Sequence, residues 1–301
     1  MNIAIAGGIG FIGTALTHHF TTQGHQVYIL SRTPKEKKKN LNYIQWLVPE
    51  ANPLENLPPL DAFINLAGES IGSGRWTHQK KAQILNSRIT TTKAAIKLLE
   101  QLEQKPSIFI NASAVGYYGH STTETFTEEQ DQGGESNFLK DVVIQWEREA
   151  KKAELLGIRT VLPRLGLVLD PKEGALPKML LPYRLFAGGA LGSGKQWYSW
   201  IHIQDLVRIF EFAIENESIH GALNVTAPHP VQMTDMGRAI ATILKRPHWL
   251  PTPSVALKVI LGEMSSLLLD GQRVIPKKAL NNGFKFTYST IDKALNNILH
   301  K

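Results

Sequence analysis

The stretch Asn2–Arg32, NIAIAGGIGFIGTALTHHFTTQGHQVYILSR, decides the fold. It begins with Ile3–Ala6, a short apolar run of the kind that forms a buried parallel strand. The next segment, Gly7–Gly13, holds four glycines. Apolar residues then recur at helical spacing as far as Gly24, and Val27–Leu30 is a second apolar run. The stretch therefore predicts a strand, a tight glycine turn, a helix and a second strand.

The glycines of this turn have the spacing of a dinucleotide-binding site. Gly8, Gly10 and Gly13 satisfy G-x-G-x-x-G, and Gly7, Gly10 and Gly13 satisfy a wider form, G-x-x-G-x-x-G. One glycine allows the sharp turn, one lets backbone N–H groups approach a pyrophosphate, and one lets the helix pack close to the strand. The helix N-terminus adds partial positive charge. A plain β-turn has the same glycines, but the flanking strands and helix favour a dinucleotide.

The end of the second strand indicates which dinucleotide binds. An NAD site usually carries Asp or Glu about 20 residues after the glycines, to bond the ribose 2′-hydroxyl. Here the chain has Ser31 and Arg32, with Lys35 and Lys37–Lys39 close behind. A guanidinium and a hydroxyl suit a 2′-phosphate, so we predict NADP(H) in preference to NAD(H). The alternative is that Arg32 is only a solvated loop cation.

Composition limits the classes of protein. The 301 residues include no cysteine, which excludes disulfides and cysteine-ligated metal, and we expect no metal site. The net charge of +7 suits an anionic ligand, but no nucleic-acid-binding motif is present. No apolar run is long enough to span a membrane, and Met1 leads directly into the first strand. We expect a cytoplasmic protein with a small-molecule substrate and no nucleic-acid or membrane partner; a homodimer is compatible with the sequence.

Apolar runs and helical patterns alternate over the rest of the first 225 residues. Strands are expected at 43–48, 61–66, 107–112 and 223–225, and helices at 79–102, 137–156 and 206–215. Such alternation predicts an α/β fold, a Rossmann-type doubly wound parallel sheet, whose ligands lie at the carboxyl ends of the strands. We expect residues 1–225 to form the NADP-binding domain, with 171–200 as a lid-like insertion. Residues 226–301 are expected to form a smaller, mostly helical substrate-side domain, with helices at 234–245 and 254–269 and a short Lys-rich tail.

Several motifs carry a family resemblance: NLAGE at 65–69, SRI at 87–89, ASAVGYYG at 112–119, and GQRVIP at 271–276. With the glycine turn, they resemble the extended short-chain dehydrogenase/reductases, in particular the atypical subgroup described as NAD-dependent epimerase/dehydratase or epimerase family protein. The resemblance implies an oxidoreductase or epimerase-like activity. It also implies a set of cofactor contacts: Gly7, Gly10, Phe11, Ile12, Gly13, Ser31, Arg32, Leu66, Ala67, Gly68 and Arg88. From the sequence alone, Arg88 lies on a predicted helix, where it could be either a cofactor contact or a surface residue.

The catalytic pattern of the resembled family is incomplete. Typical members use a Ser and, about 25 residues later, a Tyr-x-x-x-Lys pair whose tyrosine transfers a proton. Ser113 stands at the Ser position, but Phe138 and Val142 stand at the Tyr and Lys positions. Tyr117 or the neighbouring Tyr118 is a candidate replacement.

The absence of the Tyr-x-x-x-Lys pair leaves three interpretations open. We expect Ser113 and Tyr117 to be catalytic; the alternatives are aromatic packing for the tyrosines and a bond to the backbone for Ser113. Lys140 is near the lysine position but on a different helix face. The remaining hypothesis is a protein that binds NADP(H) without catalysis, for example a redox sensor.

Overall fold

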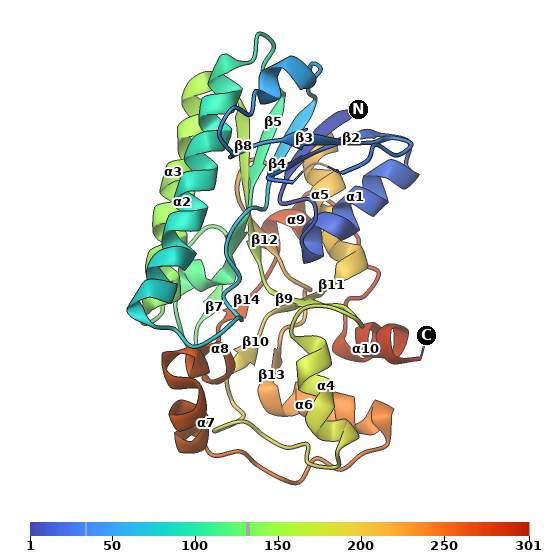
Figure 1. Ribbon diagram of the computed structural model, residues 1–301. Helices are drawn as coiled ribbons and strands as arrows, with labels where there is room; N and C mark the ends of the chain where they lie inside the picture. Colours follow the sequence, from blue (N-terminus) through green and yellow to red (C-terminus); the bar gives the residue numbers. More distant parts are fainter. Residues whose placement is uncertain (34, 131–132, 301) are drawn as a thin grey trace.

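A seven-strand parallel path forms the centre of the molecule (Figure 1). The computed structural model describes residues 1–33, 35–130 and 133–300. The strand order is β12-β8-β5-β4-β1-β2-β3, and the short strand β6 also pairs with β8. The chain reverses direction across the sheet after β3, as in a doubly wound fold. The strands are β1 (Asn2–Ala6), β2 (Gln26–Ser31), β3 (Leu41–Gln45), β4 (Ala62–Asn65), β5 (Ile108–Asn111), β6 (Ser113–Ala114), β8 (Arg159–Leu165) and β12 (Gly221–Val225).

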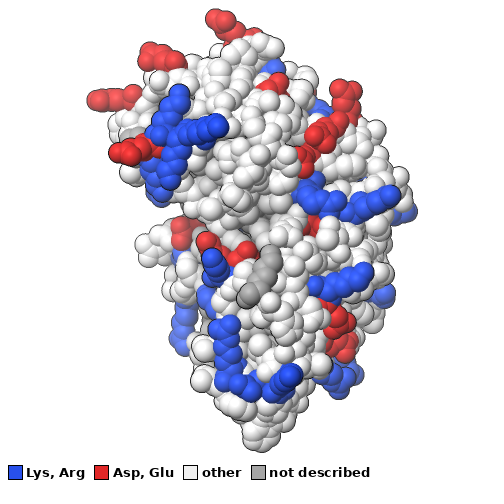
Figure 2. Space-filling view, turned by 90° about the vertical axis from the view of Figure 1, so that its right-hand side faces the viewer, with Lys and Arg blue, Asp and Glu red and all other residues white. Residues whose placement is uncertain are grey.

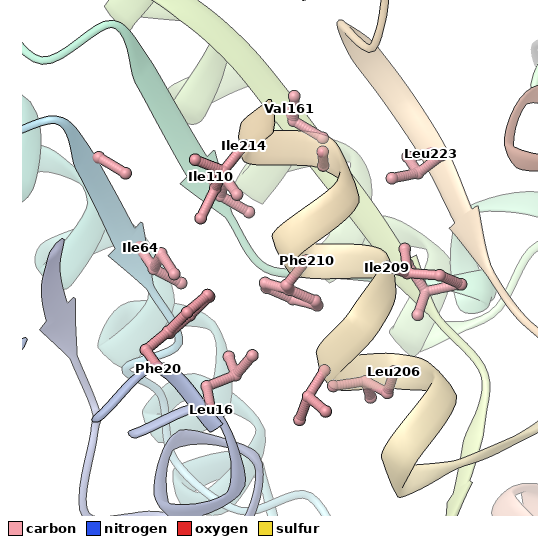
Figure 3. Close-up of a cluster of buried hydrophobic side chains, with 14 of the residues drawn as sticks. Leu16, Phe20, Ile64, Ile110, Val161, Leu206, Ile209, Phe210, Ile214 and Leu223 are labelled. Atoms are coloured by element: carbon pink, nitrogen blue, oxygen red, sulfur yellow. The ribbon is translucent and has the colours of Figure 1, made fainter. Parts of the chain in front are cut away.

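Helices cover both faces of this sheet because both faces of each central strand are apolar. In β1, Ile3 and Ile5 point to one face, and Ala4 and Ala6 point to the other. Helices α1 (Phe11–Thr22) and α5 (Ile203–Glu215) cover the first face, where their side chains meet those of the strands (Figure 3). Helices α2 (His78–Gln101) and α3 (Phe138–Ala150) lie on the opposite face (Figure 1). The Rossmann-type fold predicted from the sequence is confirmed.

A second core lies below the carboxyl ends of the strands. It joins α4 (Leu176–Arg184) and α6 (Met233–Leu244) with α10 (Ile291–Leu299). Strand β10 (Trp197–Tyr198) pairs with β13 (Val231–Gln232) in the same region. We call residues 171–200 and 226–261 the lower lobe. The expected lid-like insertion thus packs with the beginning of the C-terminal part of the chain.

The end of the chain returns to the main sheet. Strand β14 (Arg273–Val274) pairs with β7 (Thr125–Phe126), and α9 (Lys277–Asn281) packs near β12. Ala279 and Phe284 belong to the main hydrophobic core. Shorter elements complete the chain. They are the 3-10 helices η1 (Pro53–Asn56), η2 (Val115–Tyr118), η3 (Lys151–Leu156) and η4 (Gly262–Ser265), the strands β9 (Leu167–Leu169) and β11 (Trp200–His202), and the helices α7 (Ser254–Leu261) and α8 (Ser266–Leu269).

Several predicted elements have other bounds in the structure or are interrupted. The strand expected at 43–48 is β3 and ends at Gln45, before Leu47, whose φ is +60°. The helix expected at 254–269 is interrupted after Leu261, because Gly262 has a φ of +61°. The expected Lys-rich tail contains β14, α9 and α10.

In the described part of the chain, no helix combines the length and apolarity needed to cross a membrane.

Candidate nucleotide-binding site

The glycine turn lies between β1 and α1, and at two of its positions backbone atoms lie too close for a larger residue. Gly7 has a φ of +79°, and a Cβ there would lie 2.9 Å from the Ala67 backbone nitrogen. A Cβ at Gly13 would lie 2.2 Å from the Gly7 carbonyl oxygen. These two glycines therefore allow the turn, the neighbouring loop and the helix to approach one another.

Gly10 differs from the other glycines of the turn because a Cβ at this position would clash with no neighbouring atom. The nearest atom to a Cβ at this position is the Gly7 oxygen, at an ordinary 3.4 Å. The packing of the protein gives no reason for a glycine here, whereas a pyrophosphate approaching the backbone does. Gly10 is also the N-cap of α1; it offers no side-chain cap, and the first turn of the helix contains no acidic residue. The positive end of the helix dipole is thus available to an anion.

The loop after β4 lies beside the turn because β4 pairs with β1. The Leu66 N–H donates to Ala6 O, and the Ala67 N–H donates to Asn65 Oδ1 at 3.2 Å. The Asn65 amide in turn donates to Asn111 Oδ1 at 2.7 Å. Because strand pairing and buried amides fix this loop, Leu66, Ala67 and Gly68 form a defined wall next to Gly7.

Ser31 and Arg32 lie at the end of β2, the neighbour of β1 on the other side. The Ser31 side chain is buried, and its hydroxyl donates to Thr33 O at 2.6 Å. Arg32 is exposed. It lies directly after Ser31, the last residue of β2, at the carboxyl edge of the sheet.

Arg88 extends from α2 to the loop after β4. Its Nη1 donates to Glu69 O at 3.0 Å and to Ile84 O at 2.9 Å, and its guanidinium lies 5.1 Å from the centroid of the Trp146 ring. Burial lowers the pKa of Arg88 to about 10. A Cβ on Gly68 would lie 3.2 Å from Arg88 Cγ, so Arg88 packs directly against the loop after β4.

Ser113 takes part in a buried polar network. Its hydroxyl donates to Glu147 Oε1 at 2.6 Å, and the same carboxylate accepts two hydrogen bonds from Arg164, from Nε at 2.8 Å and from Nη2 at 2.9 Å. Arg164 Nη1 also donates to the Tyr118 hydroxyl, which donates to Asn224 Oδ1. The proposed alternative for Ser113, a bond to the backbone, is wrong, because the partner is a buried carboxylate.

The two tyrosines of η2 have different environments. Tyr118 is fully buried, and burial raises the pKa of its hydroxyl to about 12. The Tyr117 ring lies 3.4 Å from the Arg164 guanidinium carbon, measured to the ring centroid. Within the described chain, the structure gives its hydroxyl no hydrogen bond. Of the two, Tyr117 is therefore the one whose hydroxyl is not committed to the fold.

The positions of the missing Tyr-x-x-x-Lys pair are filled with apolar side chains. Trp76 packs edge-on against Phe138, with ring centroids 5.3 Å apart, and Val142 belongs to the same buried cluster. The Lys140 amine donates to Gly134 O at 2.9 Å. The Lys140 amine is thus bonded to the loop that precedes α3.

Sequence reasoning missed Glu147, Arg164 and the Asn65–Asn111 pair. A usable signal was present for Arg164, a cation inside the apolar strand 159–165, and for the asparagines, which occupy the same register position in two adjacent strands. The carboxylate partner is 17 residues from Arg164, and only the packing of α3 on the sheet brings the two together.

Comparison with known proteins gives concordant matches over the chain. The family model described as "NAD dependent epimerase/dehydratase family" matches residues 3–226, and a domain of unknown function matches residues 252–298. "Epimerase family protein YfhF" of Bacillus subtilis is 49% identical over 300 residues, which cover 99% of this chain and 98% of that protein. "Epimerase family protein SSP1921" of Staphylococcus saprophyticus is 42% identical over 297 residues, covering 98% of each.

Solved structures agree with these matches. The human epimerase family protein SDR39U1 (isoform 2), crystallised with NADPH, has a TM-score of 0.88 and 33% identity, and each chain covers all of the other. UDP-glucuronic acid 4-epimerase from Bacillus cereus, in complex with UDP-glucuronic acid and NAD, has a TM-score of 0.79 over 99% of this chain and 98% of that one. Its identity is 15%, so this likeness concerns the fold alone.

Proposed function

The chain belongs to the NAD dependent epimerase/dehydratase family, as an atypical short-chain dehydrogenase/reductase, and on that premise we propose that it binds NADP(H) and uses it on a small-molecule substrate. The activity would be that of an oxidoreductase or an epimerase-like enzyme. When bound, the cofactor supplies or accepts a hydride. The residues of this chain would hold the cofactor and orient it.

The observation that carries the proposal is the open Gly10 position at the uncapped N-terminus of α1. The residues present fit a dinucleotide diphosphate, because the N-terminus of α1 has no side-chain cap and no acidic residue in its first turn, and Gly10 adds no Cβ there. The NADPH in the human relative, whose fold matches over the whole chain, supports the same assignment. Gly7, Gly13, Phe11 and Ile12 would frame the diphosphate.

Preference for NADP(H) over NAD(H) rests on the end of β2. Ser31 and Arg32 stand where a NAD site usually has a carboxylate. We assign Arg32 to the 2′-phosphate, since a guanidinium binds phosphate with two parallel hydrogen bonds. On the other side of the turn, Leu66, Ala67, Gly68 and Arg88 would contact the rest of the cofactor.

Ser113 and Tyr117 are the candidates for chemistry on the substrate. Since the Ser113 hydroxyl donates to Glu147, it can accept a hydrogen bond from a substrate hydroxyl but has no further proton to donate. Tyr117 would then supply or take the proton. The cytoplasmic location and the homodimer stay predictions.

The second candidate function is NADP(H) binding without catalysis. The apolar cluster of Phe138, Val142 and Trp76 favours it, because no proton-transferring group stands at the positions where the family usually has one. Oxidation of NADPH with a stoichiometric product would separate the enzyme from the binding protein.

The test of cofactor binding is a titration of the full-length protein with NADPH and with NADH, followed by tryptophan fluorescence and by melting temperature. We expect tighter binding of NADPH, and loss of that preference in an Arg32→Asp variant. Lys37→Asp, in the same exposed loop, is the matched control and should keep it. Equal affinities for the two cofactors in the wild-type protein would refute the NADP(H) assignment.

A further inference from the structure

The lower lobe carries nearly all of the net charge of the protein. Residues 171–200 and 226–261 contain eight Lys and Arg residues against only Glu173 and Asp235, a net charge of +6 out of +7 for the whole chain. All eight cations are exposed: Lys172, Lys178, Arg184, Lys195, Arg238, Lys245, Arg246 and Lys258. Asp235 lies 3.9 Å from Arg238, so one of the two acidic residues already has a cationic neighbour.

The same lobe exposes most of the large apolar side chains found on the surface. Among the described residues, thirteen such side chains are exposed, and eight of them are here: Leu181, Leu185, Phe186, Trp249, Leu250, Val255, Val259 and Ile260. The exposed fractions reach 67% for Leu185 and 72% for Val259. Scattered single apolar residues need no explanation, whereas exposed apolar side chains that lie next to one another mark interaction surfaces.

Contacts hold two of the apolar segments together. The Trp249 indole donates to Phe186 O at 2.9 Å, and the Leu250 N–H donates to Gly188 O at 3.1 Å. The Arg246 guanidinium lies 4.3 Å from the centroid of the Phe186 ring. Apolar side chains and cations are thus presented side by side by the end of α4 and the segment before α7. Figure 2 shows the lower end of the molecule with an uncharged tip and Lys and Arg residues on both sides of it.

We propose that the lower lobe docks on a lipid surface rich in anionic headgroups. The exposed Trp, Phe and Leu side chains would enter the boundary between headgroups and acyl chains, and the Lys and Arg side chains would bind the phosphates around them. This contact lies on the surface of the bilayer. It departs from the expected lack of a membrane partner, which rested on the lack of a spanning segment.

The charge of the lower lobe favours an anionic bilayer over a second copy of the chain or an acidic protein. A second copy of the chain, bound through the same lobe, would bring two surfaces of charge +6 together, and like charges across an interface oppose association. An acidic protein would satisfy the charge, but protein interfaces are depleted in Lys, and five of the eight cations here are lysines. An anionic bilayer accepts a Lys-rich surface with protruding apolar side chains.

The test is flotation of the full-length protein with vesicles of phosphatidylglycerol and phosphatidylcholine in equal parts, against vesicles of phosphatidylcholine alone. We expect binding only to the anionic vesicles, weakened by salt. Tryptophan emission should shift to shorter wavelength on binding, and Trp249→Phe should abolish the shift. Arg184→Glu combined with Arg246→Glu should lower the partition constant by about fivefold or more for each charge changed.

Matched variants in the sheet-bearing part of the molecule control for charge and apolarity. Lys37→Glu with Lys38→Glu makes the same charge change, and Leu155→Ser removes a leucine that is 86% exposed. Both should leave vesicle binding unchanged, whereas Leu185→Ser should weaken it. No binding to anionic vesicles, equal binding to neutral ones, or equal losses in the control variants would overturn the proposal. So would concentration-dependent dimerisation that Leu185→Ser abolishes without any vesicle binding.

Discussion

The proposed diphosphate site makes opposite predictions for two neighbouring glycines, Gly10 and Gly13. An alanine at position 13 would put its Cβ 2.2 Å from the Gly7 oxygen and 2.6 Å from Gly8 Cα. Both contacts are with backbone, which cannot rotate away. An alanine at position 10 meets only the Gly7 oxygen at 3.4 Å, and the backbone φ there is −79°, which any residue adopts.

The magnitudes follow from these contacts. Overpacking of the kind expected for Gly13→Ala costs about 1–3 kcal/mol of unfolding free energy, which lowers the melting temperature by roughly 2–4 °C per kcal/mol in a protein of this size class. Gly10→Ala should leave the melting temperature of the cofactor-free protein unchanged or raise it slightly, since an alanine restricts the unfolded chain. NADPH at a hundredfold excess over its Kd adds about 2.7 kcal/mol to the wild-type protein.

The assay is thermal unfolding of both variants with and without saturating NADPH. Gly10→Ala is expected to lose the NADPH-dependent rise in melting temperature while the protein alone keeps wild-type stability. Gly13→Ala is expected to unfold at lower temperature even without cofactor. If Gly10→Ala keeps the full NADPH-dependent rise, no diphosphate lies over this residue, and the assignment of the site is refuted.

Three further predictions concern the buried polar groups. Tyr118→Phe removes two buried hydrogen bonds, to Arg164 and Asn224, and should cost about 1–3 kcal/mol of unfolding free energy in a denaturant titration. Tyr117→Phe should cost less than about 0.5 kcal/mol. An equal loss in the two variants would contradict the different environments of the two tyrosines. Glu147→Gln leaves the buried Arg164 without its counter-charge and should cost about 3–5 kcal/mol, whereas Glu149→Gln, which affects an ion pair with the half-exposed Lys152, should cost less than about 1 kcal/mol. Burial raises the pKa of Tyr118, Tyr183 and Tyr198 to about 12. Because these tyrosines lose their protons at lower pH in the unfolded chain, the melting temperature should be constant below pH 10 and fall as the pH rises to 12. Tyr183→Phe should make this fall shallower, and an unchanged slope would contradict the raised pKa of Tyr183.

Apolar periodicity and glycine positions along the chain predicted much of the fold, because these local features determine where strands, helices and turns form. The stretch Asn2–Arg32 folds as β1, α1 and β2, and the helix expected at 79–102 is α2, shifted by one residue. The errors arise where one residue changes the backbone direction, as Gly262 does in the interrupted helix. The sequence of α10 has an apolar residue at helical spacing, at Ile291, Ala294, Leu295 and Ile298, although it lies within the Lys-rich tail.

The site was predictable only where it follows from the topology of a parallel sheet. Gly7, Ala67 and the end of β2 lie together because β4, β1 and β2 are neighbours, and the carboxyl ends of such strands form one edge. The bond from Ser113 to Glu147 was not predictable, because the periodicity of a helix indicates which residues face the sheet but not which polar group each will meet. The same holds for Trp76, which reaches Phe138 from a loop of irregular sequence.

The hydrogen-bond network around Arg164 connects the sheet to the elements packed on it. Glu147 belongs to α3, Arg164 to β8, Tyr118 to η2 and Asn224 to β12, and the backbone N–H of Asn224 donates to Glu128. These buried polar residues thus connect a helix, two strands and a short helical turn to one another. A lineage built this way can exchange its proton-transferring side chains, or lose them, while the scaffold that displays the nucleotide persists.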